Sequence, residues 1–194
     1  MRFFFLREVP FGNDGNYSHD AIVARINADL ANDIGNLAQR SLSMISKNCD
    51  GKVPTPGAFS TEDKALMDAA YGLLEEIRPD IDQQQIHKVL DAIWKVVADA
   101  NRYFAAQEPW ALKKTDPERM NTVLYVTAET IRVLAILSQF VMPESAAKLL
   151  DLLSIPKEQR SFEELDNEHG LTPGLELPKP AGVFPRWVEP ETAD

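Results

Sequence analysis

The sequence predicts an all-α protein, an antiparallel helical bundle that continues into an extended, proline-rich C-terminal tail. In five segments between residues 19 and 156, apolar residues recur every three or four positions, the spacing of helices that bury one face. Prolines and an Asp-Gly pair separate these segments, and no alternating pattern typical of strands extends beyond a few residues. Consecutive helices with short connections favour an up-and-down arrangement.

The first predicted helix covers roughly residues 19 to 47. Ser18 stands where an N-cap is expected, and Asp20 places a negative charge in the first turn. Asp50-Gly51 ends the helix. The Gly/Asn/Asp cluster at residues 12–16 lacks the acidic spacing of a calcium loop, so a plain turn is expected there. The buried face of the helix comprises Ile22, Ile26, Leu30, Ile34, Leu37 and Ile45.

Four further helices are expected, each ending at a proline. Proline disfavours the helical conformation of the residue before it, and inside a helix it removes a hydrogen bond. Asp116 followed by Pro117 indicates a helix start, because proline suits the first helical position. The predicted helices run from Ser60-Thr61 to Pro79, from near Asp82 to ahead of Pro109, from Asp116-Pro117 to Pro143, and from there to Pro156.

Beyond Ser161 the composition changes. A short helical piece is expected around residues 162–165, followed by five prolines between Pro173 and Pro190. Such a segment cannot build its own core, yet it is too apolar for a free linker, so it should lie extended across another surface. The large apolar residues that alternate with the prolines are Leu171, Leu175, Leu177, Val183, Phe184 and Trp187.

Length and composition fit one globular domain, or one domain with appendages: the chain has 194 residues, of which 44% are hydrophobic and 26% charged. Cys49 is the single cysteine, which excludes an intramolecular disulfide, and no Cys/His pair has the spacing of zinc ligands. The apolar run at residues 3–6 is too short for a signal sequence, and no uninterrupted apolar segment approaches the length of a membrane span. A cytoplasmic protein without a membrane segment is therefore expected.

The charge balance argues against binding to nucleic acid duplexes. Twenty basic against thirty acidic residues give a net charge of −10, whereas proteins that follow a phosphate backbone usually carry a basic face. Recognition of a few unstacked loop bases depends less on a basic surface, because stacking and hydrogen bonds to base edges contribute much of the recognition. The acidity thus leaves loop recognition open.

Residues for catalysis are not evident. The sequence has no glycine-rich phosphate loop and no Ser/His/Asp or Cys/His set, and no catalytic or metal site is expected. The three histidines, His19, His87 and His169, lie far apart along the chain and are expected at the surface. Cys49 is expected to be a free thiol near a helix end.

The candidates for recognition are Asn36, Arg40 and Trp110. Asn36 and Arg40 are four residues apart, so they share one helix face, and an amide and a guanidinium suit the edges of splayed bases. The alternative is a surface asparagine and a salt-bridged arginine. Trp110 follows Pro109 where the chain must turn, so it is either a stacking platform or a hinge tryptophan packed under the loop. Trp94, by contrast, is expected in the core.

Four stretches and one pair of residues resemble methionyl-tRNA synthetases. The segment Phe3–Gly15 looks like the junction between the catalytic region and the helical domain, and Asn27-Ala28-Asp29-Leu30 with Gly35-Asn36-Leu37 looks like the first bundle helix. Pro109-Trp110 points in the same direction, and residues 177–186 are similar to the closing tail. The likeness covers nearly the whole chain and identifies it with the C-terminal anticodon-binding region of this class I family.

This resemblance implies roles and boundaries. The family's anticodon-reading Asn and Arg fall on Asn36 and Arg40, and its base-stacking Trp with the preceding Pro falls on Trp110 and Pro109. Residues 1–17 would end the catalytic, stem-contacting region, residues 18–160 would form the anticodon-binding bundle, and residues 161–194 a tail that packs back on the bundle or the catalytic side. The implied partners are the tRNA for methionine and the catalytic half of the synthetase.

The nucleotide-binding half of the family, with its two signature motifs, has no counterpart in these residues. ATP is accordingly expected in the full enzyme and no cofactor in this chain, which should be inactive as a ligase by itself. The catalytic half could belong to the same chain or to a separate one. A second hypothesis is a non-catalytic helical interaction module that has lost tRNA binding, but Asn36, Arg40 and Trp110 together favour the first.

Overall fold

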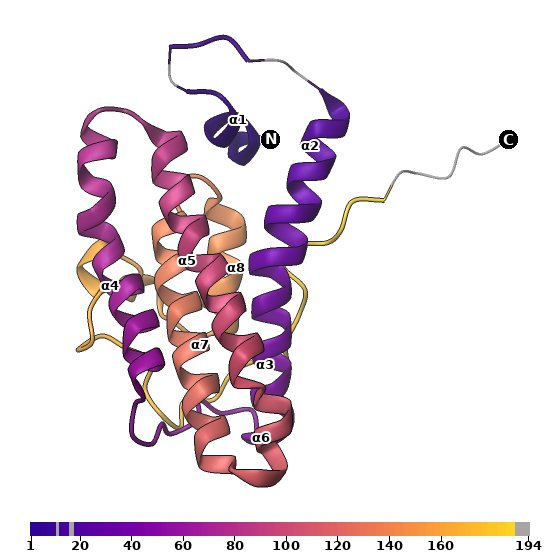
Figure 1. Ribbon diagram of the computed structural model, residues 1–194, viewed down its shortest axis with the longest axis vertical. Helices are drawn as coiled ribbons and strands as arrows, with labels where there is room; N and C mark the ends of the chain where they lie inside the picture. Colours follow the sequence, from indigo (N-terminus) through magenta and orange to yellow (C-terminus); the bar gives the residue numbers. More distant parts are fainter. Residues whose placement is uncertain (11, 16–17, 189–194) are drawn as a thin grey trace, which may run out of the picture.

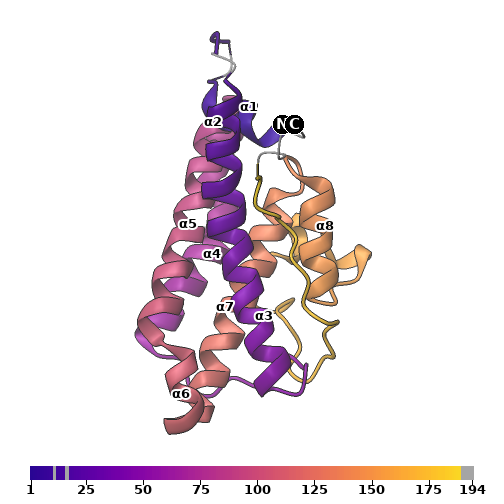
Figure 2. The same cartoon turned by 90° about the vertical axis from the view of Figure 1, so that its right-hand side faces the viewer.

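A computed structural model describes the chain except for residues 11, 16–17 and 189–194. Long helices lie side by side, with α6 at one end of the bundle and α1 at the other (Figure 1, Figure 2). The described residues form no sheet, only one antiparallel bridge between Lys52 and Glu176, so the all-α prediction is confirmed. The elements are α1 (Arg2–Glu8), α2 (His19–Arg25), η1 (Ile26–Gly35), α3 (Asn36–Asn48), α4 (Thr61–Asp82), α5 (Ile86–Gln107), α6 (Pro109–Thr115), α7 (Pro117–Ser138), α8 (Pro143–Leu152), η2 (Lys157–Gln159) and η3 (Phe162–Glu164).

The first predicted helix is a single rod made of α2, η1 and α3 (Figure 1). Ser18 caps it as expected, accepting a hydrogen bond from the Ala21 amide at 3.3 Å. Its middle section, η1, is a π-helix, which the apolar spacing did not indicate. Gly35 is the last residue of this section, and a Cβ atom there would lie only 2.6 Å from the Leu30 carbonyl oxygen. The glycine therefore permits the change from π to α geometry just before Asn36.

Three of the four helix ends predicted at prolines are confirmed, because α5, α7 and α8 end ahead of Pro109, Pro143 and Pro156; the end predicted at Pro79 is wrong. Pro79 lies inside the last turn of α4, which continues to Asp82. Pro109 and Pro143 are the first residues of α6 and α8, where a missing N–H costs no helical hydrogen bond. The predicted stop ahead of Pro109 is correct, since α5 ends at Gln107, but α6 was missed. Pro109 and Pro143 each follow one helix and begin the next, because the first helical position suits the proline ring.

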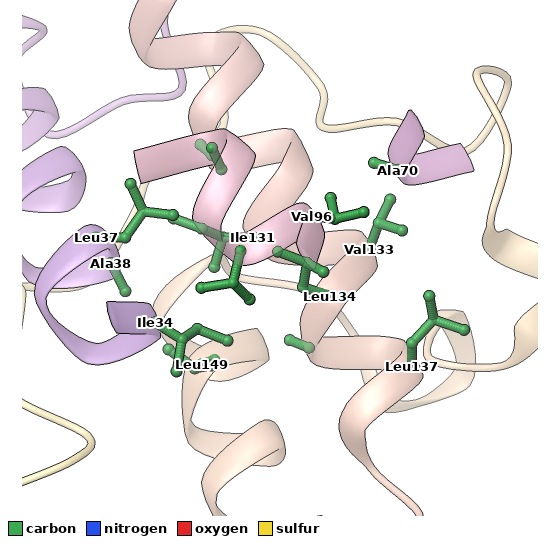
Figure 3. Packing of buried hydrophobic residues seen from close by; sticks show 14 of the residues in the cluster. Ile34, Leu37, Ala38, Ala70, Val96, Ile131, Val133, Leu134, Leu137 and Leu149 are labelled. Carbon is green, nitrogen blue, oxygen red and sulfur yellow. The ribbon is translucent and has the colours of Figure 1, made fainter. Parts of the chain in front are cut away.

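α7 is the central helix. It packs against α3, α4, α5 and α8, and every residue from Thr122 to Ser138 is buried. Figure 3 shows Ile131 and Leu134 of this helix grouped with Leu37 of α3 and Leu149 of α8. α7 is long and apolar enough to span a membrane by length and composition, but 94% of its apolar window is buried inside the bundle. It is thus the core helix of the fold.

α1 covers the end of the bundle opposite α6 (Figure 1). Its Phe3 ring lies 4.5 Å from the ring of Trp94, which is 4% exposed, so the expected burial of Trp94 is confirmed. Arg7 of α1 forms an ion pair with Asp29 of η1 at 2.8 Å. Trp94 donates its indole N–H to the Asp29 carbonyl at 3.2 Å. The π-helix is therefore tied to both α1 and α5.

The tail follows the bundle on the side of α3 and α8 as far as the described residues extend (Figure 2). Its Leu171 amide donates to the buried carboxylate of Glu129 at 2.9 Å. Further along, residues 174–177 exchange three backbone hydrogen bonds of 2.8–2.9 Å with residues 51–53. Near its end, Asn27 holds the Trp187 backbone with hydrogen bonds of 3.1 and 2.8 Å. The tail is fastened to the bundle at three places.

Candidate nucleic-acid interface

Arg40 and Trp110, which lie far apart in sequence, meet at the end of the bundle that carries α6. The Arg40 guanidinium carbon lies 5.3 Å from the centre of the Trp110 ring and 5.0 Å from that of Phe104. The two rings are 6.0 Å apart and tilted by 56°. Phe104 is 1% exposed and forms the floor, whereas Trp110 remains 45% exposed. The cation and the rings attract each other by about 0.5–1 kcal/mol per contact at exposed sites.

A sharp corner between α5 and α6 places Trp110. Glu108 adopts left-handed geometry with φ +45° at the end of α5, a conformation in which many helices end. Pro109 is buried and starts α6, so Trp110 is its second residue. The Glu108 carbonyl accepts the Ala111 amide at 2.8 Å and closes the first turn. The tryptophan therefore projects from a short helix whose start is rigid.

A buried polar cluster braces this corner on both sides. Asp63 of α4 is completely buried and accepts hydrogen bonds from Tyr103 at 2.6 Å and from Arg119 at 2.7 Å. Arg119, near the start of α7, also donates to Gln107 at the end of α5 at 2.7 Å. Burial would raise the pKa of Asp63, but the hydrogen bonds from Arg119, Tyr103 and the Ser60 amide outweigh it and lower the pKa below its ordinary value. Asp63 is ionised at neutral pH.

Asn36 occupies the first turn of α3, one turn before Arg40, and is exposed to solvent. It lines a hollow of about 350 Å³ together with Gln39 and with Gly182, Val183 and Phe184 of the tail. Among the described residues its side chain has no hydrogen-bond partner within the chain. The amide is thus free to bind a ligand beside the Arg40–Trp110 pair.

The structure brings three of the predicted site residues together: Arg40, Pro109 and Trp110 form one cluster, and Asn36 stands beside it. The hypothesis of a salt-bridged Arg40 does not apply, because in the described part of the chain Arg40 lies on aromatic rings and forms no ion pair. Trp110 is also not fully packed under a loop. Sequence analysis did not assign Phe104 to the site, although its place six residues before Trp110 could have indicated it.

The single cysteine, Cys49, is half-buried. Burial, with a smaller contribution from the Asp50 carboxylate, raises the pKa of the Cys49 thiol to about 11. The thiol is therefore protonated at neutral pH and a poor nucleophile. His19 and His169 are exposed and His87 is half-buried. Within the described ranges, no three His, Cys, Asp or Glu side chains gather as metal ligands would.

Two family models match the chain. Residues 53–194 match the anticodon binding domain of methionyl tRNA ligase, and residues 1–42 match class I tRNA synthetases (M). The chain belongs to the methionyl-tRNA ligase family. The resemblance found in the sequence is thereby confirmed, and most of the chain is the anticodon-binding domain of that family.

Similar proteins and solved structures support the same family. The methionine–tRNA ligase of Brucella suis is 61% identical over 189 residues, which are 97% of this chain and 36% of that protein. The crystal structure of apo Mycobacterium tuberculosis methionyl-tRNA synthetase superposes with a TM-score of 0.94 at 55% identity, covering 97% of this chain and 38% of that one. The same synthetase in complex with methionyl-adenylate gives 0.92 at 57% identity, over 95% of this chain and 37% of that one. The chain thus spans little more than a third of the relatives it matches.

Proposed function

We propose that this chain binds the anticodon loop of a methionine tRNA, with Trp110 as the stacking surface and Arg40 and Asn36 as hydrogen-bonding groups. The observation that supports the proposal is the partly exposed Trp110 ring, held beside an arginine without a carboxylate partner among the described residues. On a chain with a net charge of −10, an unpaired guanidinium against exposed aromatic surface suits an unstacked base.

The chemistry of the three side chains suits a splayed nucleotide. A base can stack on the exposed part of the Trp110 ring, because every base has an apolar face. Arg40 offers a planar fork of donors next to that ring, and the Asn36 amide offers both a donor and an acceptor. The methionine codon AUG pairs with a CAU anticodon, so the expected ligand is a hairpin loop that presents these three bases.

The proposal extends to the rest of the enzyme. The catalytic half, in the same or in a separate chain, would bind ATP and methionine, and this chain would hold no cofactor. It would act in the cytoplasm, where tRNA is charged, without a membrane. Residues 1–17 would join the catalytic side, residues 18–160 would carry the anticodon site, and residues 161–194 would pack back onto the bundle or the catalytic half.

Replacing Trp110 by alanine should weaken binding of a CAU hairpin by about 5- to 150-fold, because one stacking contact is worth about 1–3 kcal/mol. Fluorescence anisotropy with a labelled anticodon stem-loop measures this. Phe162→Ala is the matched control, since Phe162 is 46% exposed and Trp110 is 45% exposed.

Arg40→Ala should weaken binding and also relax discrimination at one anticodon base. Arg40→Lys keeps the charge but not the planar fork of donors, so it should not restore this discrimination. A wild-type chain that fails to distinguish CAU from other hairpins would support the interaction-module hypothesis instead.

The isolated chain should form no methionyl-adenylate, because its residues include no phosphate-binding loop and no counterpart of the family's nucleotide-binding half. ATP–pyrophosphate exchange with methionine measures this activity. Addition of the catalytic half of a relative tests the same preparation for assembly. Exchange by the pure 194-residue chain would contradict the proposed division of labour.

A further inference from the structure

We propose that Phe184 of the tail is a positioning residue for Asn36, so that the tail takes part in anticodon discrimination. The inference rests on the proposed function. It starts from the contact between the tail and the end of the π-helix. A Cβ atom on Gly35 would lie 3.1 Å from the Phe184 Cβ atom, so the tail side chain rests on bare helix backbone directly before Asn36.

Phe184 forms a wall between two hollows. It lines one hollow together with Phe3, Leu30 and Val141. On the other side it lines the hollow of about 350 Å³ that contains Asn36 and Gln39. Because Phe184 is half-buried and packed against the core, its ring defines one border of the space into which a base read by Asn36 must fit.

The tail holds Phe184 in place. Three residues further on, the Trp187 backbone is clamped by Asn27 through two hydrogen bonds, at 3.1 and 2.8 Å. Upstream, Leu177 donates to the Gly51 carbonyl at 2.8 Å. The clamp residue Asn27 belongs to the same π-helix that Gly35 ends, so the tail spans this helix from its second residue to its last.

The contact between Phe184 and Gly35 affects Asn36 more than Trp110, because it lies directly before Asn36 in the helix. Asn36 is the first α-helical residue after ten π-helical ones, and its direction depends on where the change in winding occurs. π-helical segments are uncommon and are frequent at functional sites. Phe184 against Gly35 fixes this transition, whereas Trp110 is placed by the separate corner at Glu108.

The test uses the full chain with CAU hairpins and hairpins changed at each anticodon base. Discrimination is the ratio between the affinity for the CAU hairpin and that for a hairpin changed at one base. Phe184→Ala should lower this ratio about tenfold at the base that Asn36→Ala affects. It should change the ratio little at the base that depends on Trp110. The double variant should discriminate no worse than Asn36→Ala alone, because Phe184 acts on discrimination only through Asn36. Phe184→Leu should keep most of the wild-type discrimination, because leucine still fills much of the space of the ring. Leu175→Ala, at a 36% exposed position of the tail, is the control and should discriminate like the wild type.

A measurement without RNA separates the inference from the proposed function. The side-chain amide resonance of Asn36, followed by NMR, should shift and become more mobile in Phe184→Ala and return towards the wild-type position in Phe184→Leu. An unchanged resonance overturns the positioning role whatever the RNA data show. Equal weakening for all hairpins, or additive effects in the double variant, also overturns it. A wild-type chain that binds no hairpin defeats the proposed function and the discrimination role with it.

Discussion

Replacing Glu129 by glutamine is expected to lower the free energy of unfolding by about 3–5 kcal/mol, the usual cost of leaving one buried charge without its partner. Glu129 and Arg132 are each 1% exposed, and the carboxylate accepts hydrogen bonds from Arg132 at 2.6 Å and from Tyr71 at 2.9 Å. A neutral amide leaves the guanidinium charge buried in the core. The melting temperature should fall by roughly 10 °C for a chain of this size.

The same substitution should loosen the tail. The second oxygen of Glu129 accepts the Leu171 amide at 2.9 Å, and Arg132 donates to the Glu164 carbonyl at 2.8 Å. Trypsin should therefore cut after Arg186 faster in Glu129→Gln than in the wild type, as intact mass would show. Glu144→Gln, at an exposed position of α8, is the matched control and should leave both readouts unchanged. Wild-type melting in Glu129→Gln would show that the buried pair contributes no net stability.

Replacing Asp63 by asparagine is expected to lower the free energy of unfolding by about 3 kcal/mol and to disturb the corner that carries Trp110. Asp63 is fully buried, while Arg119 keeps 20% of its side chain exposed, so we expect the lower end of the range for buried pairs. Asparagine also weakens the capping box at the start of α4, in which Asp63 accepts the Ser60 amide at 2.9 Å. Chemical denaturation measures the loss, with the exposed Asp68→Asn as control.

The pH dependence of stability gives a second readout for Asp63. Its folded pKa lies below the ordinary value of 3.8, so its contribution is present above that pH and is lost as the pH falls through the folded pKa. The stability difference between wild type and Asp63→Asn should therefore be constant at neutral pH and shrink in the acid range below about pH 4. A difference that stays constant down to acid unfolding would show that the carboxylate charge does not matter.

The local sequence predicted the long helices and several of their starts, but not α1, α6 or the π-helical winding of η1. Ser18, Ser60 with Asp63, and Asp116 cap helices through contacts within three residues, so their chemistry can be predicted without knowledge of the fold. Apolar spacing likewise predicted that Trp94 is buried. The prolines were harder to interpret, because a proline suits both the end of one helix and the first position of the next, as Pro109 and Pro143 show.

By itself, then, the sequence determined the fold class, the candidate residues and the family, because helix periodicity, capping and short motifs are local features. Only the tertiary structure showed that Arg40 rests on Phe104 and Trp110, that Glu129 and Arg132 pair in the core, and that Phe184 meets Gly35. These contacts join segments distant in sequence, and each depends on how the helices and tail pack. The physical reason is that a side chain's burial and partners are properties of the assembled core, which periodicity along one helix does not specify.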